Sequence, residues 1–173
     1  MSKDITILKR DGSREELDLE KMHKVVFYAC NDVTGVSASQ VELKSHLQFY
    51  NGIESANIQE TLIKAAADLI SEETPNYQWV AGRLINYHLR KIVYQSFEPP
   101  HLKDIARKNV DLGYYDKSFF SVYSEEEIDQ LDSYIKHDRD ENITYVGMEQ
   151  FRGKYLVQNR VTGEYSKHRR LHT

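Results

Sequence analysis

The stretch ITILKRDGSREELD, residues 5–18, decides how the first part of the chain folds. A β-prone run, ITIL, is followed by Asp11 and Gly12, a strong signal for a tight turn, and by a second run that returns. Asp18 then suits a helix N-cap, because its carboxylate can accept a hydrogen bond from a free amide of the first turn. We predict a β-hairpin that leads directly into a helix.

Four helices are expected behind this hairpin. The first covers about residues 19–30. Ser39 and Glu42 have the spacing of a capping box, which predicts the start of the second helix. The turn signal Asn51-Gly52 should end it.

The third helix is expected to start at Ser55 or Asn57. Thr74, followed by proline at the first helical position, predicts the start of a long fourth helix. In all four predicted helices, residues expected to face the core recur at helical spacing. They are Met22, Val25, Val26, Ala29, Val41, Leu43, Leu47, Phe49, Ile58, Leu62, Ile63, Ala66, Leu69, Ile70, Tyr77, Val80, Ala81, Leu84, Ile85, His88, Leu89 and Ile92. The expected fold class is α+β and mainly helical.

The paired prolines at the end of residues 97–100 mark a domain boundary. We expect one domain over residues 1–96 and a small helical segment over residues 97–164. In the second part, one helix should end at Gly113, and Ser124 with Glu127 forms another capping box. A further helix is expected over residues 142–151, and a hairpin is expected to begin at residues 154–158.

Composition limits the classes of function. The 173-residue chain has a net charge of −4, so any anionic ligand must be met by a local group of cations. No apolar run is long enough to span a bilayer, and no apolar signal core follows the first residues, so we expect a cytoplasmic protein without a membrane or nucleic-acid role. Cys30 is the only cysteine and is expected to be a small buried residue without chemistry.

The hairpin turn and its flanks carry a dense group of charges, which are Lys9, Arg10, Glu15, Asp18 and Lys21. Cations next to carboxylates suit a nucleotide, since lysine and arginine meet phosphates and a carboxylate can accept from an adenine amino group. A solvated, charged hairpin tip is the alternative interpretation on spacing alone. Arg90 and Lys91 are likewise explained by the dipole of the fourth helix.

Several known binding devices are missing from the sequence. It has neither a P-loop nor a GxGxxG pattern, and its histidines lack metal-ligand spacing such as HExxH. We therefore expect no metal site built by the protein. The charged residues at positions 138–141 are expected at a helix boundary.

Four segments, read together, resemble the large subunit of class I ribonucleotide reductase. They are KRDGS at residues 9–13, QFYNGI at 48–53, IKAAADLI at 63–70 and FEPP at 97–100. HDRD at residues 137–140 and KYLVQNR at 154–160 continue the resemblance, which reaches residue 164. In that family the first hundred residues form an ATP cone, a small two- or three-stranded cap over a four-helix bundle that binds ATP as activator or dATP as inhibitor.

The resemblance assigns roles to matching positions. Lys9, Arg10 and Lys91 would approach the phosphates, and Glu15, Asp18 and Lys21 would lie near the base. The pocket around base and sugar would be lined by Phe49, Ser55, Ile58 and Gln59. The effector is expected to bind with magnesium.

Two positions depart from the feedback-inhibited bacterial pattern, which has Asp and His where this chain has Asn57 and Gln59. Gln59 would lie beside the sugar, where ATP and dATP differ by one hydroxyl group. The resemblance therefore implies ATP binding with weakened or absent inhibition by dATP, because such discrimination rests on a few hydrogen bonds worth about 1 kcal/mol each.

The family's catalytic cysteines would lie downstream of residue 173, so this chain is expected to be a regulatory fragment of an oxidoreductase that is not catalytic alone. Its expected partners are the remaining large-subunit polypeptide and the small radical-generating subunit. A freestanding nucleotide-sensing module, or an interaction module that acts on a partner protein, is the alternative.

The last residues, 165–173, are basic where the family continues with an apolar helix start. One permitted set of codons for residues 164–173, read in a shifted frame, encodes Ile-Phe-Glu-Ala-Pro-Gln-Thr-Ala-Tyr, which matches that continuation. We therefore expect residues 165–173 to be an out-of-frame tail.

Overall fold

The computed structural model describes residues 5–9 and 12–156. These residues pack as two compact units. One comprises the described residues up to His88 together with Glu141–Glu149, and the other comprises Leu89–Asp140 with the described residues from Gln150 onward. The mainly helical α+β class expected from the sequence is confirmed.

A three-stranded sheet of order β2-β1-β3 opens the first unit. β1 (Thr6–Leu8) pairs antiparallel with β2 (Arg14–Glu16), which confirms the expected hairpin. Gly12 has a φ of +82° in the hairpin loop, a conformation that glycine adopts without steric cost. The third strand, β3 (Ile53–Glu54), pairs parallel with β1.

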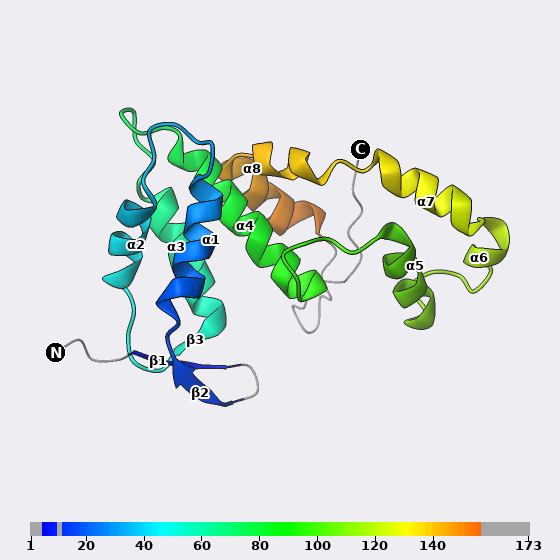
Figure 1. Ribbon diagram of the computed structural model, residues 1–173, viewed down its shortest axis with the longest axis horizontal. Coiled ribbons are helices and arrows are strands. Elements are labelled where there is room, and N and C mark those ends of the chain that lie inside the picture. The colour runs from blue at the N-terminus through cyan, green and yellow to red at the C-terminus, as the bar shows by residue number, and fades with distance from the viewer. Residues whose placement is uncertain (1–4, 10–11, 157–173) are drawn as a thin grey trace. The chain divides into compact units, whose positions relative to one another are not determined.

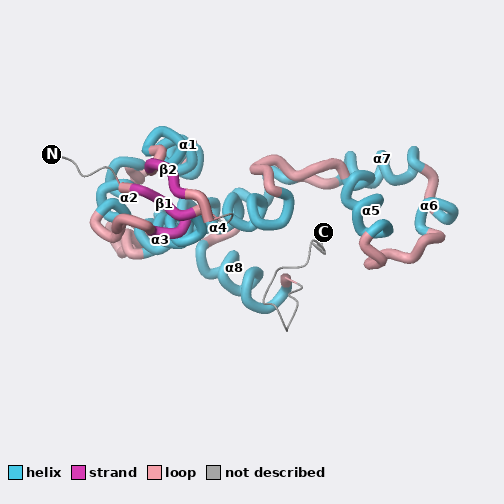
Figure 2. The backbone as a smooth tube through the Cα atoms, turned by 90° about the horizontal axis from the view of Figure 1, so that it is seen from below, coloured by secondary structure: helices cyan, strands magenta, loops and turns pink. Residues whose placement is uncertain are grey.

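Three helices of the first unit pack beside one another, and the sheet lies across one end of α1 and α3 (Figures 1 and 2). They are α1 (Leu19–Cys30), α2 (Ala38–His46) and α3 (Ser55–Ala67). The long helix α4 (Tyr77–Tyr94) begins at the end of α1 that is remote from the sheet. Its apolar face is buried along Val80, Ala81, Leu84 and Ile85, as the helical spacing predicted.

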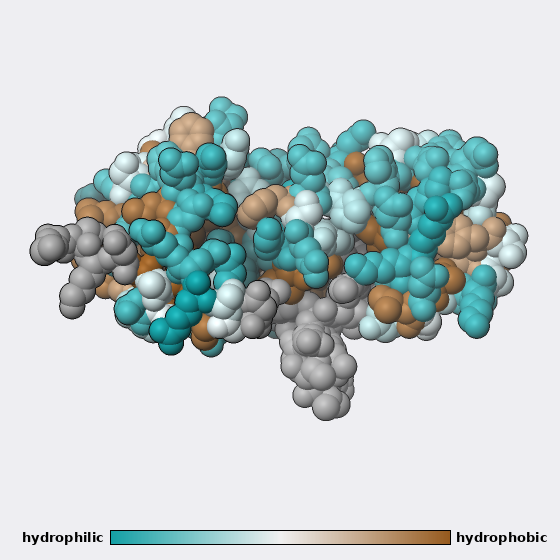
Figure 3. All heavy atoms as spheres, turned by 60° about the horizontal axis from the view of Figure 1, so that its bottom comes forward, coloured by the Kyte–Doolittle hydropathy of each residue, from teal (hydrophilic) through white to brown (hydrophobic). Residues whose placement is uncertain are grey.

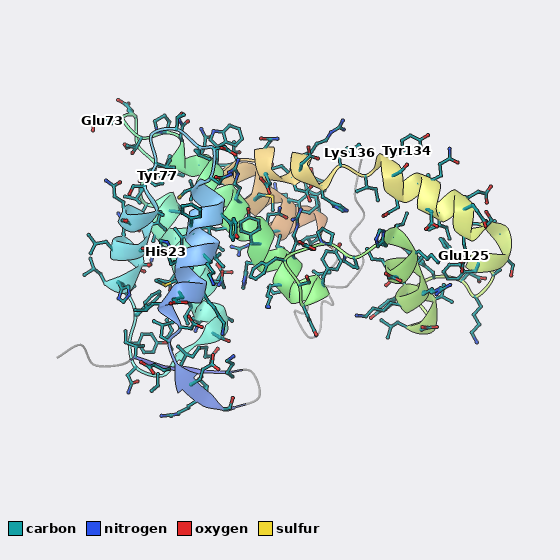
Figure 4. All side chains as sticks on the ribbon, viewed as in Figure 1. His23, Glu73, Tyr77, Glu125, Tyr134 and Lys136 are labelled. Atoms are coloured by element: carbon teal, nitrogen blue, oxygen red, sulfur yellow. The ribbon has the colours of Figure 1, made fainter. Side chains whose placement is uncertain are left out.

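Polar contacts join α2 to its neighbours. His23 Nδ1 on α1 lies 2.7 Å from Glu42 Oε1 on α2. The hydroxyl of Tyr77 on α4 accepts from the Ser37 amide at 2.9 Å and donates to Gln40 Oε1 at 2.7 Å. Figure 4 labels Tyr77 and His23.

Two predicted helix starts are wrong. The second helix begins at Ala38 after Ser37, so Ser39 is already inside the helix, and Glu42 pairs with His23 instead of completing a capping box. The Thr74 hydroxyl donates to the Leu69 carbonyl at 2.8 Å and does not cap the fourth helix, which begins at Tyr77.

The predicted end of the second helix is also too late. α2 stops at His46, and Asn51 instead accepts hydrogen bonds from the amide and hydroxyl of Thr6 at 3.0 and 2.6 Å. The Gly52 amide donates to the Thr6 carbonyl at 2.7 Å. The turn signal at residues 51–52 therefore leads the chain into β3.

The second unit contains α5 (Leu102–Asp111), α6 (Phe119–Val122) and α7 (Glu125–Tyr134). The predicted capping box is confirmed, since Ser124 and Glu127 bond to each other's backbone amides at 3.2 and 2.9 Å. Glu125 forms ion pairs with Lys103, at 2.6 Å, and with Arg107, which join α7 to α5.

The chain then passes through a 3₁₀ helix (His137–Asn142), α8 (Tyr145–Gln150) and a π-helical turn (Phe151–Tyr155). The helix expected over residues 142–151 is confirmed in its centre. The prediction of a strand beginning at residue 154 is wrong, because residues 154–155 belong to the π-helical turn and Leu156 caps it. Residues 157–158 of that predicted hairpin and the tail at 165–173 lie outside the described residues.

Asn86 is buried on α4, and its side-chain amide has no hydrogen-bond partner among the described residues. A buried amide without a partner costs about 1–3 kcal/mol. We expect Asn86→Leu to raise the free energy of unfolding by about 1–2 kcal/mol, measured by urea denaturation. Asn76→Leu is the matched control, since the Asn76 amide donates to the Thr34 carbonyl at 2.9 Å and its loss should lower stability. A destabilised Asn86→Leu variant would contradict this account.

Cys30 ends α1 and is half-buried, and burial raises the pKa of its thiol to about 11. Only about 0.1% of the thiol is then ionised at pH 8, and the thiolate is the reactive form. We expect alkylation by iodoacetamide to be slow at pH 8 and to accelerate about tenfold per pH unit up to pH 10. The urea-unfolded chain should react much faster at pH 8; a rate that levels off near pH 9 in the folded chain would show that the pKa is not raised.

Candidate functional site

One face of the small sheet is turned toward the helices. Ile7 pairs with Glu15 on β2 and with Ile53 on β3, and directly paired residues share a face of a sheet. Ile7 and Ile53 are 6% and 1% exposed, so this face covers the core. The Glu15 carboxylate therefore lies at the edge of the helix-facing side.

Lys9 follows Ile7 by two residues, and side-chain alternation places it on the same face. Its Nζ lies 2.8 Å from Glu15 Oε1, and both side chains are close to half exposed. The Lys9 amide donates to the Ser13 carbonyl at 2.8 Å, which fixes the base of the hairpin loop. Arg10, the neighbouring candidate, lies outside the described residues.

The beginning of α1 supplies a second ion pair. Asp18 caps the helix by accepting from the Lys21 amide at 3.0 Å, as predicted, and its carboxylate lies 3.0 Å from Lys21 Nζ. The hydrogen bond from the Lys21 backbone lowers the pKa of Asp18, and the hydrogen bond to Asp18 raises the pKa of Lys21. Glu15 also raises the pKa of Lys21 through its charge. The two ion pairs are therefore separate contacts, and the charge of Glu15 also acts on Lys21.

The start of α3 lies at the same end of the sheet as Lys9. Because β1 and β3 are parallel, with Leu8 opposite Glu54, the chain leaves both strands in the same direction, as Lys9 and as Ser55. Glu54 occupies the N-cap position of α3 without a side-chain capping bond. The positive end of the α3 dipole therefore lies at the end of the sheet where Lys9 follows β1.

The predicted pocket residues on α3 lie in its first two turns. Ile58 is buried, and Ser55 and Gln59 are partly exposed. Phe49 lies after the end of α2, with its ring 5.5 Å from that of His46, and so is not the helical core residue that its spacing suggested.

Two contributions to this region were not visible in the sequence. Asn51 holds the chain before β3 against β1 through its two bonds to Thr6. β3 itself is two residues long, too short to produce a periodic signal. The Asn51-Gly52 signal correctly predicted a turn, but not what the turn connects.

Lys91 belongs to the second unit, where its ammonium lies 5.1 Å from the centre of the Phe97 ring. It is in the last turn of α4, where a positive charge is also favourable for the helix dipole. The structure therefore places the Lys9–Glu15 pair at the end of the sheet where α3 starts, and the Asp18–Lys21 pair at the start of α1, which follows the other end of the three-residue strand β2.

The arrangement can bind an organic phosphate. Two ammonium groups and a helix N-terminus attract phosphate oxygens, and the two carboxylates can accept from amino groups of a base. Figure 3 shows mostly hydrophilic side chains on the sheet end of the first unit, with apolar surface between them. Over residues 5–9 and 12–156 there is no cluster of three acidic, histidine or cysteine side chains fit to hold a metal ion, and no helix there is long and apolar enough to cross a membrane.

Comparison with protein families matches residues 5–92 to the ATP cone domain. The chain belongs to the ATP cone family. The match begins one residue before β1 and ends two residues before the end of α4, so the cone contains the hairpin, the charged side chains, α1, α2, α3 and nearly all of α4.

Beyond the cone, the similarity covers nearly the whole chain. It is 52% identical over 164 residues to the ribonucleoside-diphosphate reductase 1 subunit alpha of Escherichia coli, which is 95% of this chain and 22% of the relative. The corresponding subunit of Haemophilus influenzae is 49% identical over 164 residues, again 95% and 22% of the two chains. That of phage T4 is 40% identical over 162 residues, or 92% of this chain and 21% of the relative. The resemblance to ribonucleotide reductase large subunits is thus confirmed, and the chain spans about a fifth of the length of these relatives.

Proposed function

We propose that residues 1–96 are a regulatory domain that binds ATP or dATP at the sheet end of the first unit. The observation that carries this proposal is that the Lys9–Glu15 and Asp18–Lys21 pairs both border the small sheet from which α1 and α3 start, inside an ATP cone. The phosphates would bind Lys9, Arg10 and the first amides of α3. Glu15, Asp18 and Lys21 would lie nearer the base, and Phe49, Ser55, Ile58 and Gln59 would surround base and sugar.

The ion pairs keep the cations in place without blocking the ligand. Lys9 and Glu15 are 40% and 44% exposed, and pairs this exposed contribute little net stability. A triphosphate can therefore replace the carboxylate as the partner of Lys9 at low cost. Magnesium would be carried by the phosphates.

In the cell, the domain would regulate a ribonucleoside-diphosphate reductase. The catalytic part of the large subunit would be supplied by further sequence or by a second polypeptide, and the small subunit by another polypeptide. The support is the 52% identity to the reductase alpha subunit of Escherichia coli. A freestanding nucleotide-sensing module has the same cone, and co-purification with a cysteine-bearing reductase polypeptide would distinguish the two roles.

Thermal unfolding with added nucleotides tests the binding. A ligand at 100 times its Kd stabilises the folded state by about 2.7 kcal/mol, so saturating ATP should raise Tm by several degrees. GTP and inorganic triphosphate at the same concentration are the controls, and they should raise Tm much less, because their phosphates lack the adenine contacts. An equal rise in Tm with inorganic triphosphate would show that the site binds anions without recognising adenine, and would contradict the proposal.

Gln59 is expected to weaken discrimination between ATP and dATP. The side chain lies one turn after Ser55 on α3, and its amide replaces the histidine of the inhibited bacterial pattern. We expect the chain to bind ATP and dATP with Kd values within about fivefold of each other, because one hydrogen bond contributes about 1 kcal/mol. Calorimetry of Gln59→His should widen that ratio, whereas Gln48→His, on the loop before β3, is the matched control. Binding of dATP more than tenfold tighter than ATP by the unmodified chain would contradict the expectation.

A further inference from the structure

Arg83 on α4 connects two distant segments of the first unit. Its Nη1 donates to the carbonyls of Asn31 and Ala29 at 2.6 and 3.3 Å, at the end of α1. Its Nε donates to the Glu141 carbonyl at 3.2 Å. One side chain thus holds the end of α1 and the start of the Glu141–Glu149 segment at once.

The charge of this arginine is matched by backbone alone. Across the described residues, no carboxylate forms an ion pair with Arg83, and its acceptors include a carbonyl of the last turn of α1. That end of a helix carries the negative end of the dipole, so the guanidinium stabilises it. The contact therefore depends on the position of the α1 end rather than on a mobile side chain.

Gly82, next to Arg83, allows the backbone of the Glu141–Glu149 segment to approach α4 closely. A Cβ at Gly82 would lie 2.2 Å from the Ile143 carbonyl oxygen and 3.0 Å from the Thr144 carbonyl carbon. Backbone of residues 143–144 thus lies directly on α4 beside Arg83. Met148, one turn further on, is fully buried, and its amide donates to the Thr144 carbonyl at 2.9 Å.

The other end of α1 carries half of the candidate nucleotide site. Asp18 and Lys21 lie at its first turn, and Ala29 lies in its last turn. A helix of 12 residues is about 18 Å long and moves as a rod, so a shift at one end is felt at the other. Met22, Val26 and Ala29 are buried along its length, which opposes bending.

We propose that Arg83 couples nucleotide binding at the start of α1 to the docking of Glu141–Glu149 on α4. A bound nucleotide holds the first turn of α1, the end of α1 becomes fixed, and the bonds of Arg83 to Asn31 and Glu141 are formed more of the time. The segment that returns from the second unit is then held more firmly on the cone. This inference rests on the proposed nucleotide function and adds the route by which occupancy leaves the site.

Hydrogen exchange of the whole chain, with and without saturating ATP, tests the coupling. We expect ATP to slow exchange of the Gly147 and Met148 amides by at least about fivefold, the lower end of typical allosteric coupling. The amides of α5 are the internal control for general stabilisation and should slow less. In Arg83→Lys, which keeps the charge but loses the planar fork, ATP should still raise Tm while the response at residues 147–148 disappears. Arg107→Lys, in the second unit, should respond as the unmodified chain does.

The outcomes separate the two proposals. If ATP raises Tm but leaves exchange at residues 147–148 unchanged in the unmodified chain, the coupling is wrong and the binding function stands. A response that persists in Arg83→Lys also overturns the role of Arg83. If ATP neither raises Tm nor alters exchange anywhere, the nucleotide function itself fails.

Discussion

Reversing two charges, with Lys9→Glu and Lys21→Glu together, should weaken ATP binding by at least about 100-fold, since a hydrogen bond to a charged group contributes about 1.5–3 kcal/mol and each 1.4 kcal/mol is a tenfold change in Kd. Both lysines lie beside a carboxylate, at 2.8 Å from Glu15 and 3.0 Å from Asp18. The substitutions therefore leave four carboxylates and neither lysine around the proposed nucleotide site, with Lys9 lost from the phosphates and Lys21 from the region of the base. Calorimetric titration with ATP measures the loss.

The matched control changes the same total charge elsewhere. Lys64 lies nine residues after Ser55 on α3, and Lys44 donates to the Asp68 carbonyl just past the far end of that helix. Lys44→Glu with Lys64→Glu should change the Kd for ATP by less than about threefold, because both lie more than about 8 Å from the start of α3, and exposed charges at that separation are largely screened at physiological salt. An equal loss in both double variants would mean that net charge, and not this cluster, determines binding. Far-UV circular dichroism checks that each variant is folded.

Gly82→Ala should destabilise the chain, although the same change in most helices is favourable. Alanine exceeds glycine in a helix interior by about 0.5–1 kcal/mol. At Gly82, however, the new Cβ would lie 2.2 Å from the Ile143 carbonyl oxygen, which belongs to backbone and cannot rotate away. Overpacking costs about 1–3 kcal/mol, and a contact this short with backbone belongs at the upper end of that range, so after the gain from alanine we expect a net loss of about 2 kcal/mol in the free energy of unfolding.

Gly153→Ala provides the comparison, because nothing lies within 4 Å of a Cβ at that helical position. It should be neutral or slightly stabilising. Urea denaturation of both variants decides the matter by the sign of the change. A stabilised Gly82→Ala would mean that Glu141–Glu149 does not dock on α4 as described, and would remove the basis for the role of Arg83.

Local signals in the sequence were sufficient for much of the fold. Asp18 has both the side chain and the position of an N-cap, and Ser124 with Glu127 has the full reciprocal pattern, so each could be predicted from a few neighbouring residues. The core positions of α4 follow from their spacing in the same way. Contacts of this kind lie within one helical turn.

The features that the sequence did not reveal depend on residues far apart along the chain. Glu42 satisfies the capping pattern with Ser39, yet it pairs with His23 because α1 lies beside α2. β3 exists because Asn51 and Gly52 bond to Thr6, 45 residues earlier for the Asn51 pair. Arg83 bonds to backbone carbonyls 52 and 58 residues away. Every residue has a backbone carbonyl, so the sequence does not show which ones the arginine will bind.

The sequence likewise predicted the local part of the candidate site but not the part that depends on strand pairing. Residue types and spacing indicated the cluster at the hairpin, because its members lie within a few residues of one another. The start of α3 entered the prediction only through the resemblance to a family, since the parallel pairing of β1 and β3 is what brings it beside Lys9. The nucleotide-binding roles of all ten candidate residues, Lys91 and Arg10 included, are predictions.

Photolabelling with 8-azido-ATP, followed by peptide mapping, tests the central claim most directly. The claim is that adenine nucleotide binds where the hairpin, the start of α1 and the start of α3 meet. We expect label in peptides that contain residues 6–21 or 49–59, and excess ATP should abolish it. Label confined to residues 102–155, or label that ATP does not compete away, would contradict the account.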